Sequence, residues 1–314
     1  SNVTLKDAIE NIDVGGTTMI RAAAKNFENV LVVVDPEDYN KIGKALLKNS
    51  ADSLRQMLAA KAFYHLSFYD SQIGRFLNKE LFPQEISLGL RKTIDLRYGE
   101  NPHQKAAAYM YPNNNSPLNN LRRRWGRELS LVNITDINAG LEVVRLFNEP
   151  CAVVIKHNSP CGIAIGKTIK EALDRAIEAD PESAFGGIIV LNKTLDKKTA
   201  EVIGEFKNTK RANIDIVAIP NINRDAFDFL SKVRKTMGIY IFGKIPKNRA
   251  YKENIKWIDG GLVLQTPDKD IEKGFRNWKV VTKKKPSKKE IEQMKIAWKF
   301  ISRIKSNAII VIDK

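Results

Sequence analysis

The sequence predicts an α/β fold built from two consecutive parts, residues 1–85 and residues 86–314. Short β-branched runs alternate with longer segments of helical spacing, a pattern typical of layered α/β folds. The length of 314 residues is enough for two domains on the usual scale of about 100–200 residues each. A hydrophobic content of 43% and a charged content of 28% indicate a folded chain with a substantial core.

The elements of the first part follow from its hydrophobic pattern. Residues 1–13 predict a helix, and Val30–Val34, closed by Asp35 and Pro36, predicts a buried strand. Residues 39–62 have helical spacing, and a second helix is expected to follow through Phe76. The pair Phe82-Pro83 ends this part.

The second part alternates more regularly. Residues 87–111 are expected to be extended around a Gly99–Pro102 turn, residues 111–121 to form a polar loop, and residues 136–147 to be an amphipathic helix. Further helices are predicted at residues 169–179, 195–206, 226–230 and 287–304, the last with Ser287 and Glu290 as a capping box. Strands are predicted at residues 152–155, 187–191, 215–219, 239–242, 261–264, 280–282 and 308–312.

The composition excludes several classes of protein. The sequence has no apolar run of about 18 residues that could span a membrane, and no signal peptide, so we expect a cytoplasmic protein. Cys151 and Cys161 are the only cysteines and are expected to be reduced thiols. Neither a pair of CxxC units nor an HExxH motif is present, so no metal site is expected.

The formal net charge of +16 permits a nucleic-acid partner. Much of the excess lies near the end of the chain, in Lys283–Lys285 and Lys288-Lys289. These lysines lack the interleaved aromatic residues that would stack on bases, so nucleic-acid binding is the least favoured reading. A solvated lysine-rich surface is expected, with anionic small-molecule substrates as a second contributor to the charge.

The segment Val154–Gly162, VIKHNSPCG, places two titratable groups at the end of a strand. His157 can accept a proton near neutral pH, and the charge of Lys156 favours its neutral form. The Lys156 ammonium could stabilise an oxyanion. Successive strand residues point to opposite faces, so both groups reach one site only if the chain turns, which we expect at residues 159–162. The alternative is a strand-end histidine beside a solvent-exposed lysine.

The segment Asp95–Gln104, DLRYGENPHQ, gathers polar groups around a glycine and a proline. Arg97 could bind a phosphate with two parallel hydrogen bonds, which a lysine does less specifically. The alternative is an ordinary charged turn.

Three further segments carry weaker signals. Phe185, before the pair Gly186-Gly187, could stack on a flat ring while the glycines let backbone approach a ligand, although such glycines also occur in ordinary turns. Asp13 precedes a Gly-Gly pair that leads into a helix, where free N–H groups can seat an anion. Asn307 could orient an amine or a carbonyl, or could simply occupy a helix-to-strand turn.

Six segments occur in one order along the chain: IENIDVGGTTMIRAAAKN, DLRYGENPHQ, IKHNSPCGIA, ADPESAFGGIIVLN, DGGLVLQ and IKSNAIIV. Together they resemble the bifunctional AICAR transformylase/IMP cyclohydrolase family of purine biosynthesis, from about Val3 to Ile312. The resemblance implies a cytidine-deaminase-like layered transformylase domain over residues 86–314, without the deaminase zinc. It also implies that residues 1–85 are the C-terminal part of a methylglyoxal-synthase-like cyclohydrolase domain.

The resemblance also implies an activity, formyl transfer from the co-substrate 10-formyltetrahydrofolate to the 5-amino group of AICAR, which gives FAICAR. His157 matches the proton acceptor, Lys156 the group that stabilises the oxyanion or protonates the folate nitrogen, and Asn307 the amide that positions the reacting groups. The family's nucleotide-binding positions are matched by Arg97, Tyr98, Phe185, Gly186 and Asp215. Its cyclohydrolase positions are matched by Asp13 and Lys25.

The sequence departs from the family pattern at both ends. The phosphate-binding Lys-Thr region and catalytic Tyr of the cyclohydrolase are absent, as is the second deaminase-like layer with its folate contacts. We therefore expect a middle portion that needs a homodimer partner or a complementary C-terminal half chain, with cyclohydrolase activity lost or incomplete. The alternative is a non-catalytic nucleotide-binding or scaffold fragment.

Overall fold

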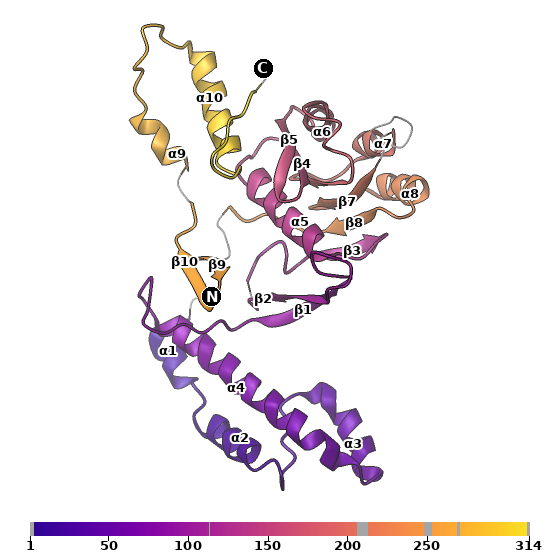
Figure 1. Ribbon diagram of the computed structural model, residues 1–314, viewed down its shortest axis with the longest axis vertical. Coiled ribbons are helices and arrows are strands. Elements are labelled where there is room, and N and C mark those ends of the chain that lie inside the picture. Colours follow the sequence, from indigo (N-terminus) through magenta and orange to yellow (C-terminus); the bar gives the residue numbers. More distant parts are fainter. Residues whose placement is uncertain (1–2, 113, 206–212, 248–252, 269–270, 313–314) are drawn as a thin grey trace. The chain divides into compact units, whose positions relative to one another are not determined.

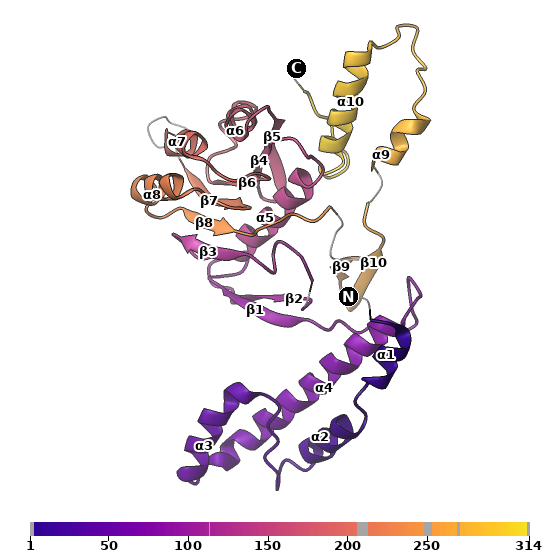
Figure 2. The same cartoon turned by 180° about the vertical axis from the view of Figure 1, so that it is seen from behind.

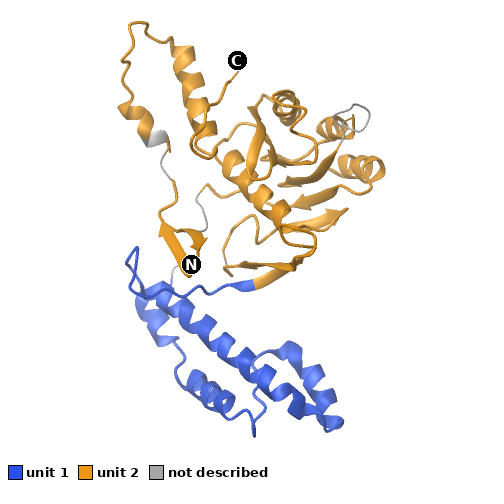
Figure 3. Cartoon of the chain, viewed as in Figure 1, with its two compact units in different colours: residues 1–91 blue, residues 92–314 orange. Residues whose placement is uncertain are grey.

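The computed structural model describes residues 3–112, 114–205, 213–247, 253–268 and 271–312. The chain divides into two compact units, residues 1–91 and residues 92–314 (Figure 3). The division falls after Arg91, six residues beyond the predicted boundary at residue 85.

The first unit is helical in its described part, with helices α1 (Leu5–Glu10), α2 (Gly15–Lys25), α3 (Tyr39–Leu47) and α4 (Arg55–Leu77). Thr4 begins α1 with a capping box, since its hydroxyl accepts from the N–H of Asp7. The single helix predicted over residues 39–62 is wrong, because the chain breaks after α3 where Asn49 has φ of 51°. A left-handed residue ends a helix, and α4 then starts afresh.

The strand predicted at Val30–Val34 is also wrong. The segment is extended and Val32 is buried, but it joins no ladder. A strand needs a neighbour for its N–H and C=O groups, and the described part of the first unit contains none. The segment packs instead through Val32 and Val34 against Ala24, Ala59 and Ala62 of the helices.

The second unit is built on a mixed six-stranded sheet of order β3-β8-β7-β6-β4-β5 (Figure 1). The pairs β6/β7 and β7/β8 are parallel, and the other pairs are antiparallel. The central strands read as continuous hydrophobic runs because both faces of the sheet are covered. The strands are β3 (Arg122–Trp125), β4 (Cys151–Lys156), β5 (Ser159–Ile165), β6 (Gly187–Leu191), β7 (Ile214–Ile219) and β8 (Gly238–Ile241).

Helices cover both faces of this sheet, as Figures 1 and 2 show from opposite sides. Helices α6 (Ile169–Glu178), α7 (Lys197–Glu205) and α8 (Arg224–Val233) pack over a core that includes Val154, Ile189 and Val217. Helix α5 (Leu131–Val144) covers the opposite face over Ile155 and Ile188. The predicted α/β fold is therefore confirmed at the level of a mixed sheet between helical layers.

Both edge strands of the sheet escaped prediction. Residues 159–162, expected as a turn because of Pro160 and Gly162, begin the edge strand β5. Proline lacks an N–H donor and is tolerated at a sheet edge, where one side of the strand pairs with nothing. The register with β4 shifts so that Cys161 is the extra residue of a bulge. The opposite edge strand, β3, consists of RRRW, whose arginines keep it exposed.

Most other elements of the second unit agree with prediction. Strands β1 (Arg91–Leu96) and β2 (Ala106–Met110) pair around the expected turn, and β10 (Gly261–Gln265) pairs with an unpredicted β9 (Asn254–Ile258). Helix α10 (Lys288–Ile301) has the predicted capping box, whereas α9 (Ile271–Gly274) is a single turn. The predicted helix over residues 195–206 is α7, and its last predicted residue, Phe206, lies outside the described residues.

The strands predicted at Val280–Thr282 and Ala308–Ile312 are wrong, since neither segment is assigned to a ladder. Ile310 and Ile312 pack against the core on the α5 side instead. No helix in the described ranges is long and apolar enough to cross a membrane.

Candidate functional site

The hairpin between β4 and β5 carries the two titratable residues singled out by the sequence. Lys156 is the last residue of β4 and pairs with Ser159, so the turn consists of His157 and Asn158 alone. Both residues have positive φ, 53° and 61°, the conformation of a tight two-residue hairpin turn. The predicted turn at residues 159–162 is therefore corrected to residues 157–158.

A buried carboxylate holds this turn from the other side. Asp136 of α5, only 3% exposed, accepts the backbone N–H of His157 at 3.2 Å and that of Asn158 at 2.6 Å. Burial raises the pKa of the Asp136 carboxyl, against the lowering effects of the two N–H donors and of the His157 charge. Asp136 went unnoticed in the sequence, where only its place in an amphipathic helix was visible.

Lys156 and His157 are held by different parts of the hairpin. The alternation of strand residues puts Lys156 on the face of Val154, which α6 covers, whereas the His157 turn rests on Asp136 of α5. Within the described residues, no hydrogen bond or ion pair joins the two side chains. Burial raises the pKa of the nearby Cys161 thiol and the Lys156 charge opposes that shift, which agrees with Cys161 being a strand residue and not a nucleophile.

Arg97 and Tyr98 lie together after strand β1. The Arg97 guanidinium stacks on the Tyr98 ring, 4.7 Å from its centroid, and donates to its hydroxyl at 3.0 Å. Backbone bonds tie the pair to the segment before α5, from Arg97 N–H to the Leu129 carbonyl and from Leu131 N–H to the Tyr98 carbonyl. Arg97 thereby lines a pocket of about 470 Å³.

Three cations line this pocket, Arg97, Arg127 and Lys235, beside Trp125, Gly126 and Thr236. Arg127 bonds to Asp215 at 2.9 Å, with both side chains about three-quarters buried, and donates through Nε to the Thr236 carbonyl. The pocket therefore carries a positive charge that only Asp215 offsets among its described ion pairs. Arg127 and Lys235 were not predicted, because their sequence neighbourhoods contain no motif.

The backbone of Arg127 is held by the side chain of Tyr240. Tyr240 of β8 is buried and donates its hydroxyl to the Arg127 carbonyl at 2.8 Å. Burial raises the pKa of Tyr240 to about 12, so the hydroxyl remains a donor at physiological pH. Gly126 has φ of 73° and lies against the Met237 carbonyl, which leaves no space for a side chain.

Phe185 and Gly186 precede strand β6. The Phe185 side chain is 50% exposed, so its ring is available to a ligand. Gly186 has φ of 75°, donates its N–H to the Asn213 carbonyl before β7, and borders open space where a Cβ would be.

These segments share one edge of the sheet, which is the edge formed by the amino ends of β6, β7 and β8 and not an edge strand. Strand β4 is antiparallel to β6, so Lys156 and His157 lie near the amino end of β6, where Phe185 and Gly186 are also found. Asp215 and Lys235 lie near the amino ends of β7 and β8, and Trp125 at the end of β3 pairs with Ile239 of β8. The sheet thus brings five of the eight residues predicted for the transformylase site to one edge, and Arg97, stacked on Tyr98, reaches the same edge through the pocket.

A family model described as AICARFT/IMPCHase bienzyme matches residues 23–314. The chain belongs to this family. A bifunctional purine biosynthesis protein PurH from Thermoanaerobacter sp. (strain X514) is 43% identical over 315 residues, which cover 99% of this chain and 60% of that protein. PurH proteins from Lysinibacillus sphaericus and Persephonella marina are 42% and 38% identical, with similar coverage. The chain therefore spans about 60% of the length of these relatives, and the predicted family is confirmed.

Asn307, counted above among the eight transformylase residues, is the exception to the shared edge. It follows α10, is exposed, and accepts a hydrogen bond from the Ser306 hydroxyl at 2.9 Å. The structure gives it no contact with Lys156 or His157 within the described residues. The edge therefore holds Lys156, His157, Phe185, Gly186 and Asp215, and the pocket adds Arg97, which is stacked on Tyr98.

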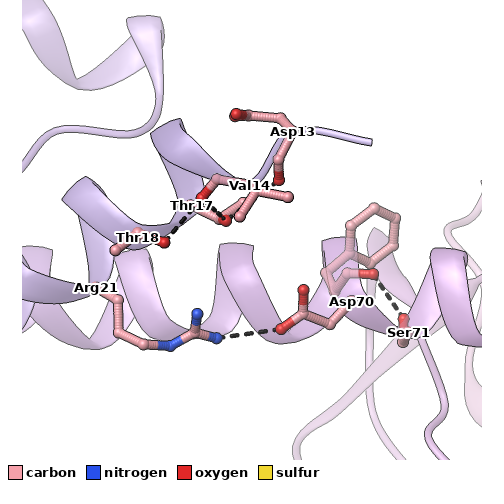
Figure 4. Close-up of polar contacts among 8 residues, drawn as sticks. Asp13, Val14, Thr17, Thr18, Arg21, Asp70 and Ser71 are labelled. Carbon is pink, nitrogen blue, oxygen red and sulfur yellow. Dashed lines mark hydrogen bonds and ion pairs between the residues drawn. The ribbon is translucent and has the colours of Figure 1, made fainter. Parts of the chain in front are cut away.

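The two predicted cyclohydrolase residues lie at opposite ends of α2 in the first unit. The Asp13 carboxylate accepts the Gly16 N–H at 2.9 Å, so the helix start that could seat an anion is capped by the chain itself. The neighbouring polar groups are bonded within the unit (Figure 4). The Thr18 hydroxyl donates a hydrogen bond to the Val14 carbonyl, and Arg21 forms an ion pair with Asp70 at 3.1 Å. Lys25 is exposed at the last turn of the helix.

Three further observations concern described residues outside the predicted site. No group of three or more His, Cys, Asp or Glu side chains in the described ranges could hold a metal ion. A second pocket of about 570 Å³ lies at the opposite edge of the sheet, beside Asn192, Asn221 and Gly243, and contains none of the predicted residues. Lys283–Lys285 are exposed, as expected for a solvated basic surface.

Proposed function

We propose that the second unit is the first, cytidine-deaminase-like half of an AICAR transformylase domain, which transfers a formyl group from 10-formyltetrahydrofolate to AICAR in IMP biosynthesis. The observation that carries the proposal is the shared sheet edge. There Lys156 and His157, the pair predicted to act on the amine, lie at the same ends of the strands as the cationic pocket of Arg97 and Arg127. The family membership supports the same reaction.

The chemistry asks for a proton acceptor and for charge stabilisation. The AICAR amine is conjugated with the carboxamide, so it is a weak nucleophile that must lose a proton as its nitrogen bonds to the formyl carbon. We assign His157, helped by the substrate carboxamide, as the acceptor of that proton. Lys156 stabilises the tetrahedral oxyanion and protonates the folate nitrogen as the old carbon–nitrogen bond breaks.

The remaining residues bind the nucleotide. Arg97, stacked on Tyr98, binds the AICAR phosphate with Arg127 beside it in the same pocket. Phe185 and Gly186 flank the base, and Asp215 lies near the nucleotide while it orients Arg127. Asn307 is assigned the role of positioning the reacting groups, as the family pattern implies.

The proposal includes a partner that supplies the folate contacts. None of the residues assigned above binds the folate, and we propose that a complementary C-terminal half chain, a homodimer partner, or both supply those contacts. We propose further that the first unit is the C-terminal part of a cyclohydrolase domain, and that Asp13 and Lys25 belong to its site.

The test mixes the purified chain with AICAR and 10-formyltetrahydrofolate and follows the release of tetrahydrofolate by absorbance. Little turnover is expected from the chain alone, and turnover should appear when the C-terminal half of the transformylase domain of a PurH relative is added. Turnover that stays at the background rate with the added half, while AICAR still binds, would favour the alternative of a non-catalytic nucleotide-binding or scaffold fragment. Failure of AICAR to bind at all would reject both functions.

A further inference from the structure

The turn of His157 and Asn158 presents two backbone donors that its own hairpin cannot satisfy. Lys156 and Ser159 form the last pair of the ladder, so the N–H groups of the two turn residues point away from it. Successive N–H groups in left-handed residues form a small concave donor site that attracts an anion. Without an internal acceptor this site would be open to water or to the anionic groups of a ligand.

Asp136 fills that donor site from within the protein. Its carboxylate divides its two oxygens between the donors, with Oδ2 on His157 and Oδ1 on Asn158. The side chain is 3% exposed and projects from α5, whose neighbouring residues Ile134 and Ile137 are fixed in the core. The turn is therefore held in place by a residue of a packed helix and does not depend on hydrogen bonds to solvent.

We infer that Asp136 is a positioning residue for formyl transfer, which holds the His157 turn at the geometry that proton transfer requires. The inference rests on the proposed function, since it gives the role of the turn in that reaction. A carboxylate suits this task because it offers an acceptor to each donor, whereas an amide would offer one oxygen and set its NH₂ group against the second N–H.

The predicted consequence is a loss of rate without a loss of substrate affinity. The phosphate pocket around Arg97 lies on other segments, so AICAR should still bind when the turn shifts. A misplacement of a catalytic group by about 1 Å can cost on the order of 10²-fold in rate. Asp136→Asn should thus lower kcat by about that factor with KM for AICAR essentially unchanged.

The experiment compares three variants in the chain reconstituted with the C-terminal half of a relative. Asp136→Asn removes one acceptor, and Asp136→Glu keeps both oxygens and should recover part of kcat. Asn192→Ala is the matched control, because Asn192 accepts the Cys151 N–H at 2.8 Å and so supports the opposite end of the same strand β4. A second readout, the amide resonances of His157 and Asn158 in the nitrogen-15 NMR spectrum, is independent of turnover.

Each outcome decides one claim. Shifted His157 and Asn158 amides in Asp136→Asn, together with a kcat loss absent from Asn192→Ala, would support the inference. Wild-type kcat in Asp136→Asn would overturn it, and so would equal losses of kcat in Asp136→Asn and Asn192→Ala. An absence of turnover in the reconstituted wild type would instead reject the proposed function, and the amide shifts would still report whether Asp136 holds the turn.

Discussion

At the scale of single residues, the two arginines of the candidate site differ in how firmly they are fixed. Arg127 is fixed by Asp215, by the Thr236 carbonyl and through its own carbonyl by Tyr240, so its position does not depend on a ligand. Arg97 stacks on Tyr98 and keeps donors free of any carboxylate among the described ion pairs. A phosphate that enters the pocket therefore finds one pre-positioned cation and one that can close on it.

Arg97→Ala should weaken AICAR binding by about 10- to 100-fold, because a hydrogen bond to a charged group contributes about 1.5–3 kcal/mol. The riboside that lacks the phosphate should bind both proteins equally, and isothermal titration calorimetry measures the four affinities. Arg122→Ala is the control, since Arg122 is an exposed arginine of β3 that does not line the pocket. Equal effects of Arg97→Ala on AICAR and on the riboside would remove the phosphate from this assignment.

Asp136 predicts a pH dependence of stability with a definite sign. Burial raises its pKa above the ordinary 3.8, so the folded state holds the proton more tightly than the unfolded state. Its contribution to the free energy of unfolding is fully present below pH 3.8 and is lost as the pH rises through the raised pKa. Urea unfolding of the wild type and Asp136→Asn across this range should show the difference between them falling with pH, then levelling. A difference that grows with pH would contradict the assignment.

At the scale of elements, the sequence predicts those structures that depend on local pattern. Strands β6 and β7 are runs of Ile and Val closed by turn residues, and the helices α6 and α10 carry visible N-caps at Thr168 and Ser287. Motifs likewise pointed to Arg97, Lys156 and His157. Prediction fails where a partner distant in sequence decides the outcome.

The errors share that physical cause. Val30–Val34 and Ala308–Ile312 have strand composition but no neighbouring strand, while the edge strand β5 forms despite Pro160 because β4 is beside it. Asp136 and Arg127 join the candidate site only through contacts with Asn158 and Asp215, which lie far along the chain. Hydrophobic periodicity reflects only the local sequence, so it cannot indicate such contacts.

Gly126, in the connection between β3 and α5, is expected to tolerate a side chain less well than its backbone conformation alone would predict. Gly126 and Gly260 have nearly equal φ, 73° and 74°, but a Cβ at Gly126 would strike the Met237 carbonyl, whereas one at Gly260 meets open space. Gly260→Ala should cost about 1–2 kcal/mol of unfolding free energy from the left-handed conformation alone. Gly126→Ala should cost clearly more and also weaken AICAR binding, as urea titration and calorimetry would show. Equal costs would refute the close approach to Met237.

At the scale of the whole molecule, the two units differ in how much core they contain. The second unit has two large clusters of buried residues, one on each face of its sheet. The first unit has one small cluster, Ala24, Val32, Ala59 and Ala62, and leaves Leu47, Tyr64 and Met19 exposed. Hydrophobic burial is the dominant stabilising contribution to folding, so stability is expected to reside mainly in the second unit.

A chain of residues 92–314 should accordingly fold alone and bind AICAR with the affinity of the full chain, since every residue proposed to bind the nucleotide lies in that range. Residues 1–91 alone should unfold at low urea or associate through their exposed apolar side chains. Circular dichroism and calorimetry test both fragments. Loss of AICAR binding in a folded 92–314 chain would show that the first unit completes the site.

The central claim is that AICAR occupies the edge of the sheet at the amino ends of β6, β7 and β8. Hydrogen exchange of the chain with and without AICAR tests it most directly, because the two sheet edges carry separate amides and separate pockets. AICAR should slow exchange at residues 97–98, 125–127, 156–158, 185–186 and 235–236. Protection confined to residues 192–193, 220–221 and 243–245 at the opposite edge, or to the first unit, would contradict it.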